Sequence, residues 1–184
     1  AAVIAVAVCV FYYICSKNKK SAEIPLPENF TLTAHTGCEK TPDNSLEAIT
    51  KGFESGADIV EFDLNFDESG TPLLAHDRAE KNSVSLEDAF KLIAGYENLK
   101  VNIDCKKTDD LRAVVALSEK HGIKDRIFYT GIEEKDVAAV KAQTPDIIYF
   151  LNVPMKEIKK DATSLSSLAD KIESLGAVGI NMKH

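Results

Sequence analysis

The stretch EFDLNFDESGTPLLAHD, residues 61–77, decides the fold prediction, because it combines a strand, a turn and a short returning strand. Apolar residues flank its first two acids, Glu61 and Asp63. Side chains alternate between the two faces of a strand, so these carboxylates are expected to point the same way. The alternative is an exposed hairpin, but the run IVEFDL is too apolar for a strand in solvent. We therefore expect a buried strand that carries two acids, followed by a turn at residues 68–70.

Six strands of the βα type and one extra strand are predicted along the chain, and they alternate with amphipathic helices. Strands are expected at residues 30–37, 57–66, 71–77, 99–106, 125–132, 145–153 and 177–183. Helices are expected at residues 44–56, 85–98, 109–122, 133–144 and 164–176. Asn44 or Ser45, and then Ser85, are the expected N-caps of the first two helices. This alternation predicts an α/β fold with a parallel sheet and right-handed crossovers.

The positions of polar residues decide between an open doubly wound sheet and a (β/α)8 barrel of the TIM type. Nearly every predicted strand carries polar residues at its C-terminal end, as in a barrel that builds one site from many strands. No glycine-rich phosphate loop follows the first strand, which counts against a nucleotide-binding open sheet. The sequence therefore favours the barrel. The strand-end residues are His35, Glu61, Asp63, Asp104, Lys106, Thr130, Asn152 and Asn181.

The predicted barrel is incomplete, because eight strands and about 250 residues are typical of the fold. The chain has 184 residues, begins with Ala1 rather than methionine, and stops at His184, just past the sixth βα strand. We therefore expect the sequence to be a fragment of a longer protein, with a domain at residues 30–184 that is incomplete at its C-terminus. Its first and sixth strands are expected to be unpaired edges.

The N-terminal segment differs in composition from the rest of the chain. Residues 1–16, AAVIAVAVCVFYYICS, are uncharged and typical of a transmembrane anchor or a signal segment. Residues 17–29 are expected to form a polar, proline-containing tether. A single-pass N-terminal anchor predicts a membrane localisation, and we expect the domain at residues 30–184 on the extracytoplasmic side.

Composition excludes several kinds of site. The net charge is -7, and no stripe of basic residues is interleaved with aromatic residues, so a nucleic-acid partner is not expected. The four cysteines form no CxxC pair and no regular ladder. Neither a disulfide framework nor a structural zinc site is therefore predicted. The oligomeric state does not follow from these features.

Three acids at neighbouring strand ends predict a metal site. Glu61 and Asp63 share one face of their strand, and Asp104 ends the next βα strand. Without a cation the three carboxylates would repel one another, whereas an oxygen cage of this kind suits Ca²⁺ or Mg²⁺. Lys106 points the same way as Asp104, so it brings a positive charge to the same strand end.

Two histidines are the expected proton-transfer groups. His35 ends the first strand in AHTG, and His76 ends the short strand in LLAHD. Two imidazoles beside a metal can remove one proton and deliver another. Taken singly, each histidine is also consistent with a hydrogen-bonded structural role. His121 does not belong to the predicted cluster of acids, and we interpret it as a charge at a helix C-terminus.

The segment AHTGCEKTPDNSLEAITKGFESGADIVEFDLNFDESGTPLLAHD resembles the opening of the glycerophosphodiester phosphodiesterase family. The family pattern runs His-Arg-Gly, Pro-Glu-Asn-Thr/Ser, Glu-x-Asp, Asp-Gly and His-Asp. The later VNIDCK resembles its Glu-x-Lys strand. The resemblance extends more weakly over residues 31–184, and the order and spacing of the separate motifs make it specific.

The resemblance implies a (β/α)8 barrel that hydrolyses glycerophosphodiesters to an alcohol and sn-glycerol 3-phosphate with a divalent metal. The expected partner is a small-molecule glycerophosphodiester, and we expect the fragment alone to be inactive. The implied residues are the metal ligands Glu61, Asp63 and Asp104, the acid–base pair His35 and His76, and the substrate-binding positions Lys106, Thr36, Asp43 and Asn44.

Three positions depart from the family pattern. Thr36 stands where the family has an arginine that grips the phosphate, so a bidentate, always charged donor is lost. Asp43 replaces the glutamate of the Glu-Asn motif. Asp104 also stands where the family has a glutamate, and the aspartate side chain is one carbon shorter. Only residues 77–84 separate His76 from the next predicted helix, so the small domain that many family members carry there is absent.

Two alternatives remain open. A weakened family member would bind a phosphodiester or a polyol phosphate without turning it over, which the threonine in place of the arginine motivates. An orotidine-phosphate-decarboxylase-like barrel is suggested by DCKKTD, residues 104–109, which matches the Asp-x-Lys-x-x-Asp signature of such barrels. That second alternative leaves His35, Glu61, Asp63 and His76 without a role.

Overall fold

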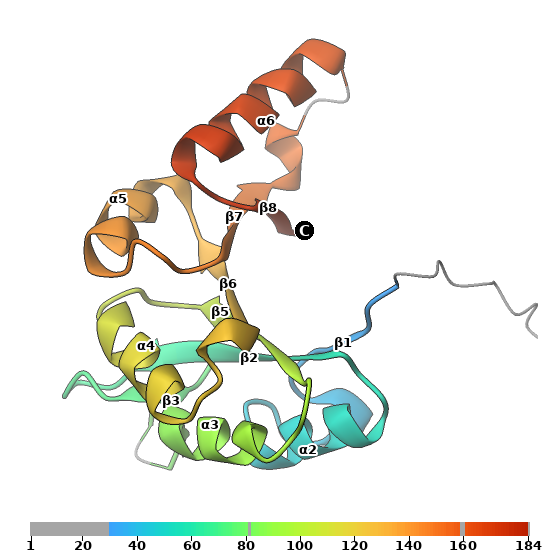
Figure 1. Cartoon of the computed structure of the whole chain (residues 1–184), viewed down its shortest axis with the longest axis vertical. Coiled ribbons are helices and arrows are strands. Elements are labelled where there is room, and N and C mark those ends of the chain that lie inside the picture. The colour runs from blue at the N-terminus through green and yellow to red at the C-terminus, as the bar shows by residue number, and fades with distance from the viewer. Residues whose placement is uncertain (1–29, 81, 159–160, 184) are drawn as a thin grey trace, which may run out of the picture. The chain divides into compact units, whose positions relative to one another are not determined.

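A mixed sheet of eight strands organises the part of the chain that the computed structural model describes, residues 30–80, 82–158 and 161–183. Two short antiparallel strands, β3 (Pro72–Leu74) and β4 (Val84–Ser85), extend the sheet beside the end of β2. The other strands are parallel to their neighbours and follow chain order (Figure 1). They are β1 (Thr33–Ala34), β2 (Ile59–Phe66), β5 (Lys100–Cys105), β6 (Ile127–Ile132), β7 (Tyr149–Pro154) and β8 (Gly179–Lys183).

Helices connect the parallel strands, as the alternating pattern predicts. Ser45 and Ser85 are the N-caps of the first two, and each side chain accepts a hydrogen bond from the backbone N–H three residues later. The described α-helices are α2 (Leu46–Glu54), α3 (Leu86–Ala94), α4 (Leu111–Lys120), α5 (Glu134–Gln143) and α6 (Ala162–Leu175). Short 3-10 turns lie at η1 (Cys38–Lys40), η2 (Lys124–Arg126) and η3 (Met155–Glu157).

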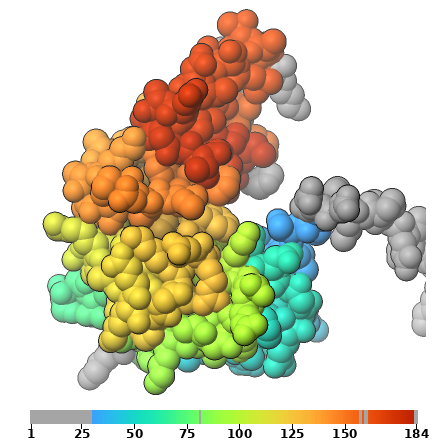
Figure 2. Space-filling model, in the orientation of Figure 1, coloured from blue at the N-terminus to red at the C-terminus, as the bar shows by residue number. Residues whose placement is uncertain are grey.

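Strand β2 lies at the centre of the core, and all eight of its residues are buried. One of its edges pairs with β5, and the other pairs first with β1 and then with β3. Helix α3 packs against both α2 and α4. Figure 2 shows the segments that contain α3, in green, and α4, in yellow, packed against each other on one face. A strand enclosed in this way must be apolar on both faces, which explains the near-continuous run of β2.

The predicted order of elements is confirmed, with two local differences. The first strand is short: β1 pairs with β2 only at Thr33 and Ala34, and the chain then turns at Gly37, whose φ is 74°. Strand β4 was not predicted, because two residues carry no detectable alternation. The antiparallel hairpin of residues 61–77 is present, with Leu64 opposite Leu74.

Within the described residues the sheet is open, since no pairing joins β8 to β1. This agrees with the prediction of a barrel that is only partly represented. Bulky apolar side chains near the outer strands are exposed, among them Val178 beside β8 and Leu165 on α6.

The predicted membrane localisation is wrong. Among the residues that the structure describes, no helix combines the length and the apolar character needed to cross a bilayer. Residues 1–16, on which the prediction of an anchor or signal rested, lie outside the described residues, as does the tether at 17–29.

Candidate functional site

Three carboxylates from two adjacent strands meet at one end of the sheet. Asp63 on β2 and Asp104 on β5 are direct partners in the strand register, and Glu61 lies two residues before Asp63 on the same face. One oxygen from each carboxylate lies within 4.8 Å of the others. Glu61 and Asp63 are buried, with exposed fractions of 7% and 3%. The cluster that the sequence predicts is therefore assembled, and it could hold a metal ion.

Lys106 supplies the positive charge beside this cluster. Its ammonium nitrogen lies 2.9 Å from Asp63 Oδ1 and 2.5 Å from Asp104 Oδ2. Burial favours loss of the Lys106 proton, but the two carboxylates outweigh burial and raise the pKa of the ammonium group. Three carboxylates and one ammonium group leave two negative charges when all are ionised, and this hard oxygen donor set fits a divalent cation.

Glu61 is a buried carboxylate whose pKa is raised by its surroundings. Burial raises its pKa, and the negative charges of Asp63 and Asp104 add to that effect. The backbone N–H of Thr36 donates to Glu61 Oε2 at 3.0 Å and partly offsets the rise, as does His35. A bound cation would favour the ionised form of Glu61.

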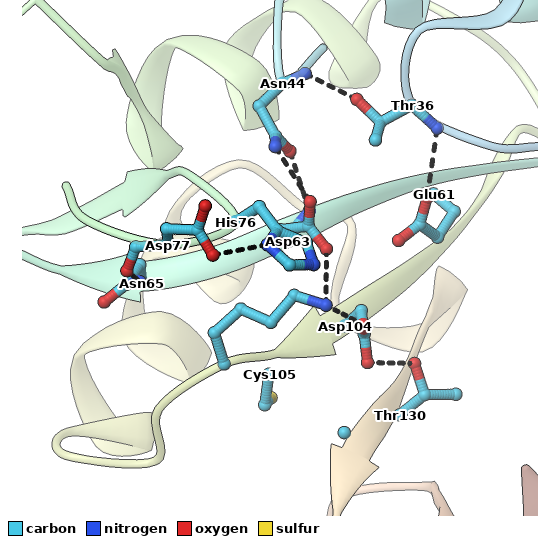
Figure 3. A network of polar contacts seen from close by, with 12 residues as sticks. Thr36, Asn44, Glu61, Asp63, Asn65, His76, Asp77, Asp104, Cys105 and Thr130 are labelled. Atoms are coloured by element: carbon cyan, nitrogen blue, oxygen red, sulfur yellow. Dashed lines mark hydrogen bonds and ion pairs between the residues drawn. The ribbon is translucent and has the colours of Figure 1, made fainter. Parts of the chain in front are cut away.

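Asn44 and Thr36 tie the loop before α2 to the carboxylates (Figure 3). The Asn44 amide makes two bonds to Asp63: Nδ2 donates to Oδ2 at 2.8 Å, and Oδ1 accepts from the Asp63 backbone N–H at 2.9 Å. The Asn44 backbone N–H donates in turn to Thr36 Oγ1 at 2.5 Å. Asn44 has a φ of 54°, a left-handed conformation that asparagine tolerates better than most residues.

Both histidines are oriented through their Nδ1 atoms. His35 Nδ1 lies 2.9 Å from the Thr36 carbonyl oxygen, and His76 Nδ1 lies 2.8 Å from Asp77 Oδ1. A carbonyl or an ionised carboxylate only accepts hydrogen bonds, so Nδ1 carries the proton in both rings. Nε2 is then the nitrogen that can exchange a proton. In His35 it lies 3.6 Å from Glu61 Oε2.

Two polar residues, Asn65 and Thr130, have clear structural roles that the sequence analysis did not assign to them. Buried Asn65 donates from Nδ2 to the Asp77 carbonyl oxygen at 2.6 Å, which fixes the loop that carries His76. It lies two residues after Asp63 on the same strand face, and that spacing was an available signal. The Thr130 hydroxyl on β6 lies 3.0 Å from Asp104 Oδ1, opposite it in the strand register.

Asp43 behaves differently from the other candidate residues. No hydrogen bond or ion pair joins it to the carboxylate cluster within the described part of the chain. It lies beside Gly37, where an added Cβ would lie 2.0 Å from Asp43 Oδ1. The structure therefore places Asp43 against the loop that follows β1.

A cavity of about 440 Å³ opens beside the cluster at the C-terminal ends of the strands. His76, Asp104 and Lys106 line one part of it, and Asn152 and Asn181 line another. All but three of its lining residues are polar or charged, the exceptions being Cys105, Gly131 and Met182. The cavity therefore suits a polar, water-soluble ligand.

Residues 35–112 match the sequence model of the Glycerophosphoryl diester phosphodiesterase family. The resemblance to this family is confirmed. The matched residues include every candidate side chain of the carboxylate cluster and both histidines.

Individual relatives are more distant. An uncharacterized protein of Bacillus subtilis, YqiK, is 27% identical over 129 residues, which are 60% of this chain and 52% of YqiK. The chain thus spans about half the length of this curated relative.

Solved structures share the fold. A candidate glycerophosphodiester phosphodiesterase from Galdieria sulphuraria has a TM-score of 0.68 at 19% identity, over 88% of this chain and 76% of that one. A phosphodiesterase from Oleispira antarctica, in complex with the product sn-glycerol-3-phosphate, has a TM-score of 0.65 at 17% identity, over 83% of this chain and 74% of that one. These likenesses confirm the α/β fold of the glycerophosphodiester phosphodiesterase barrels, with the described sheet left open.

Proposed function

We propose that this chain carries the catalytic centre of a metal-dependent glycerophosphodiester phosphodiesterase, which releases an alcohol and sn-glycerol 3-phosphate. The observation that carries the proposal is the cluster of Glu61, Asp63 and Asp104, with one ligand oxygen of each within 4.8 Å of the others. The family match over residues 35–112 supports the same reaction. The Oleispira antarctica phosphodiesterase, solved with sn-glycerol-3-phosphate, supports this substrate class.

Glu61, Asp63 and Asp104 would hold the divalent metal, Ca²⁺ or Mg²⁺. Bound there, the metal supplies positive charge against the phosphoryl oxygens. Lys106 adds a second positive charge on the cavity side of Asp104. Its raised pKa keeps the ammonium group charged throughout the physiological pH range. Both effects stabilise negative charge that develops in the transition state.

His35 and His76 divide the proton transfers between them. One Nε2 accepts the proton of the nucleophile, either water or the glycerol hydroxyl of the substrate, as its oxygen bonds to phosphorus. The bond from phosphorus to the departing oxygen breaks, and the Nε2–H of the other histidine protonates that oxygen. Water then opens the cyclic phosphate if the glycerol hydroxyl was the nucleophile. In either case Nδ1 stays fixed by Thr36 O in one ring and by Asp77 in the other.

The polar cavity favours substrates without an acyl chain. Burial of a hydrocarbon chain is favourable only against apolar surface, and the cavity offers little of it. Glycerophosphocholine and glycerophosphoethanolamine are therefore better candidates than an acylated phosphodiester of the same head group.

A second candidate function is binding of a phosphodiester or polyol phosphate without turnover. Thr36 favours it, because threonine cannot supply the charged, bidentate phosphate contact of the family's arginine. The decarboxylase-like alternative has less support. It leaves Glu61 and Asp63 without a role, whereas the structure joins Asp63 to Lys106 and brings Glu61 into the same carboxylate cluster.

The test is a phosphodiesterase assay with glycerophosphocholine and glycerophosphoethanolamine, with Ca²⁺ or Mg²⁺ added. It is run on the 184-residue chain and on the complete open reading frame that contains it. The comparison matters because the described sheet is open, and we propose that the chain alone has little activity. The control is His121→Ala, which changes a histidine away from the cluster, against His35→Ala.

The expected result is turnover that EDTA and His35→Ala abolish and His121→Ala preserves. Isothermal titration of each form with Mn²⁺ and with sn-glycerol 3-phosphate decides between the two candidates. Ligand binding without turnover at any metal concentration in the complete protein would favour the binding function and contradict the enzyme.

A further inference from the structure

We propose that Thr36 is a positioning residue that fixes the carboxylates of Glu61 and Asp63 from the loop before α2. The proposal rests on the metal site of the proposed function, but it assigns Thr36 no contact with substrate. It explains what a threonine contributes at a position where the family pattern has an arginine.

The first link is a direct backbone contact. The Thr36 N–H donates to Glu61 Oε2 at 3.0 Å, and Thr36 is buried, with 9% of the residue exposed. A buried carboxylate needs such donors, because an ionised group without partners is expensive to remove from water. This contact requires the loop to hold Thr36 at one fixed distance from β2.

The second link passes through the threonine hydroxyl. Thr36 Oγ1 accepts the backbone N–H of Asn44, which is held at a φ of 54°. A left-handed backbone costs free energy at residues other than glycine, less at asparagine than at most, and a specific contact offsets that cost. The hydroxyl oxygen of Thr36 accepts this N–H and so supplies that contact.

The third link is the Asn44 amide, which makes one bond to the side chain and one to the backbone of Asp63. An amide can do this because it offers a donor and an acceptor together. The result is a continuous hydrogen-bond chain from the Thr36 hydroxyl through Asn44 to Asp63. Both carboxylates that β2 contributes to the cluster are thus set by one residue of the loop.

An arginine at position 36 could not make the second link. The guanidinium group has donors only, so it cannot accept the Asn44 N–H. A threonine hydroxyl can, and it is short enough to do so within the loop. Where the family pattern has an arginine that donates to the phosphate, this chain therefore has a threonine hydroxyl that accepts a hydrogen bond and orders the carboxylates.

The experiment compares substitutions that keep or remove the acceptor. Thr36→Ser keeps a hydroxyl, Thr36→Val has nearly the same shape without it, and Thr36→Arg introduces the residue of the family pattern. The matched control is Thr41→Val, which removes a different hydroxyl bond in the same loop, from Thr41 Oγ1 to the Cys38 carbonyl at 2.7 Å. Circular dichroism of each variant of the full chain establishes that it is folded.

Two measurements are made on each variant. The first is hydrogen exchange of the Asn44 side-chain amide by NMR in EDTA, which needs no metal. The second is Mn²⁺ affinity, followed by the loss of the free-ion signal in electron paramagnetic resonance. We expect Thr36→Val and Thr36→Arg to lose amide protection and to bind Mn²⁺ about 10- to 100-fold more weakly, the usual effect of removing a residue that orients ligands. Thr36→Ser restores both, and Thr41→Val keeps both.

Unchanged amide protection in Thr36→Val, or equal Mn²⁺ affinity in Thr36→Val and Thr41→Val, overturns the proposal. If no form of the protein binds Mn²⁺, the proposed metal-dependent function fails. The exchange measurement still decides the positioning link in that case, so the two failures are distinguishable.

Discussion

The ammonium nitrogen of Lys106 lies 2.9 Å from Asp63 Oδ1, across the boundary between β5 and β2, and it also contacts Asp104. The Lys106 ammonium group therefore bridges Asp63 and Asp104, which the strand register places side by side. Lys106 has two consequences that can be separated by experiment. It reduces repulsion among the carboxylates, and it lines the cavity in which a phosphate would lie.

Lys106→Met should separate these consequences. Loss of the ammonium group leaves the carboxylates less well compensated, so the chain in EDTA should unfold more easily, by about 1–3 kcal/mol. The same excess of negative charge should strengthen Mn²⁺ binding, whereas turnover should fall about 100-fold because a charge against the phosphoryl oxygens is lost. Urea unfolding, Mn²⁺ titration and the assay of the active form measure the three effects.

Lys107→Met is the control for that prediction. Lys107 also lines the cavity, but among the described residues its ammonium nitrogen contacts the Phe66 carbonyl oxygen, at 3.4 Å, and none of the three carboxylates. It should therefore change neither metal affinity nor stability by a comparable amount. Weaker Mn²⁺ binding in Lys106→Met than in the wild type would contradict the electrostatic interpretation.

Gly131→Ala should prevent β6 from approaching β5 as closely as it does. Gly131 has a φ of 78°, and an added Cβ would lie 2.3 Å from the Cys105 carbonyl oxygen and 2.8 Å from Asp104 Oδ1. Gly70→Ala is the matched control, with a φ of 84° and open space around it. We expect a loss of about 1–2 kcal/mol for Gly70→Ala from the backbone alone. Gly131→Ala should lose about 1–3 kcal/mol more from the collision, measured by urea unfolding. Equal losses would show that β5 and β6 can move apart freely.

Glu61→Gln should stabilise the metal-free protein in a pH-dependent way. Burial raises the pKa of Glu61 above its ordinary value of 4.5, so the folded state holds this proton more tightly than the unfolded chain does. Glu61 therefore subtracts stability above its folded pKa, and the cost disappears as the pH falls to the ordinary value. Urea unfolding in EDTA should show Glu61→Gln more stable than wild type at pH 7, with the difference lost at about pH 4.

The control for this pH dependence is Glu54→Gln on the exposed side of α2, where the side chain is 52% exposed. It should change stability little at either pH, because exposed ion pairs contribute little. A Glu61→Gln variant that is less stable than wild type at pH 7 would show that the ionised carboxylate is better compensated than its surroundings indicate.

The elements of the fold were predictable because their signals are local. Ser45 and Ser85 are N-cap residues and predict the starts of helices α2 and α3. Strand β2 is long and apolar enough to be recognised by itself. Strand β4 is two residues long and exists only because β3 lies beside it. Such a strand depends on a partner distant in sequence, so it has no pattern of its own to detect.

The residues of the site could be predicted from the sequence, but the pairings and hydrogen bonds between them could not. Alternation places Glu61 and Asp63 on one face, but the pairing of Asp63 with Asp104 and of Asp104 with Thr130 depends on the register between strands. The two bonds of Asn44 to Asp63 depend on a left-handed backbone that the sequence permits without requiring. Long-range geometry of this kind is set by tertiary packing.

Asn65→Ala should show whether the loop that carries His76 is fixed by the Asn65 side chain on β2. Asn65 is buried and donates to the Asp77 carbonyl oxygen at 2.6 Å, while the Asp77 carboxylate orients His76 Nδ1. Asn65→Ala should lose about 1–3 kcal/mol of stability, because the Asp77 carbonyl and the Phe66 N–H lose their partner. It should also lower kcat while leaving Mn²⁺ affinity unchanged, since the carboxylate cluster is not touched.

Asp77→Ala is the comparison for Asn65→Ala. The Asp77 side chain is 93% exposed, so its removal should cost little stability but should lower kcat by releasing the His76 ring. If both residues act by orienting His76, the double variant should lose less activity than the product of the two single losses, because a ring already released cannot be released again. Losses that multiply independently would contradict a common action through His76 and would assign Asn65 to the stability of the β2–β3 hairpin alone.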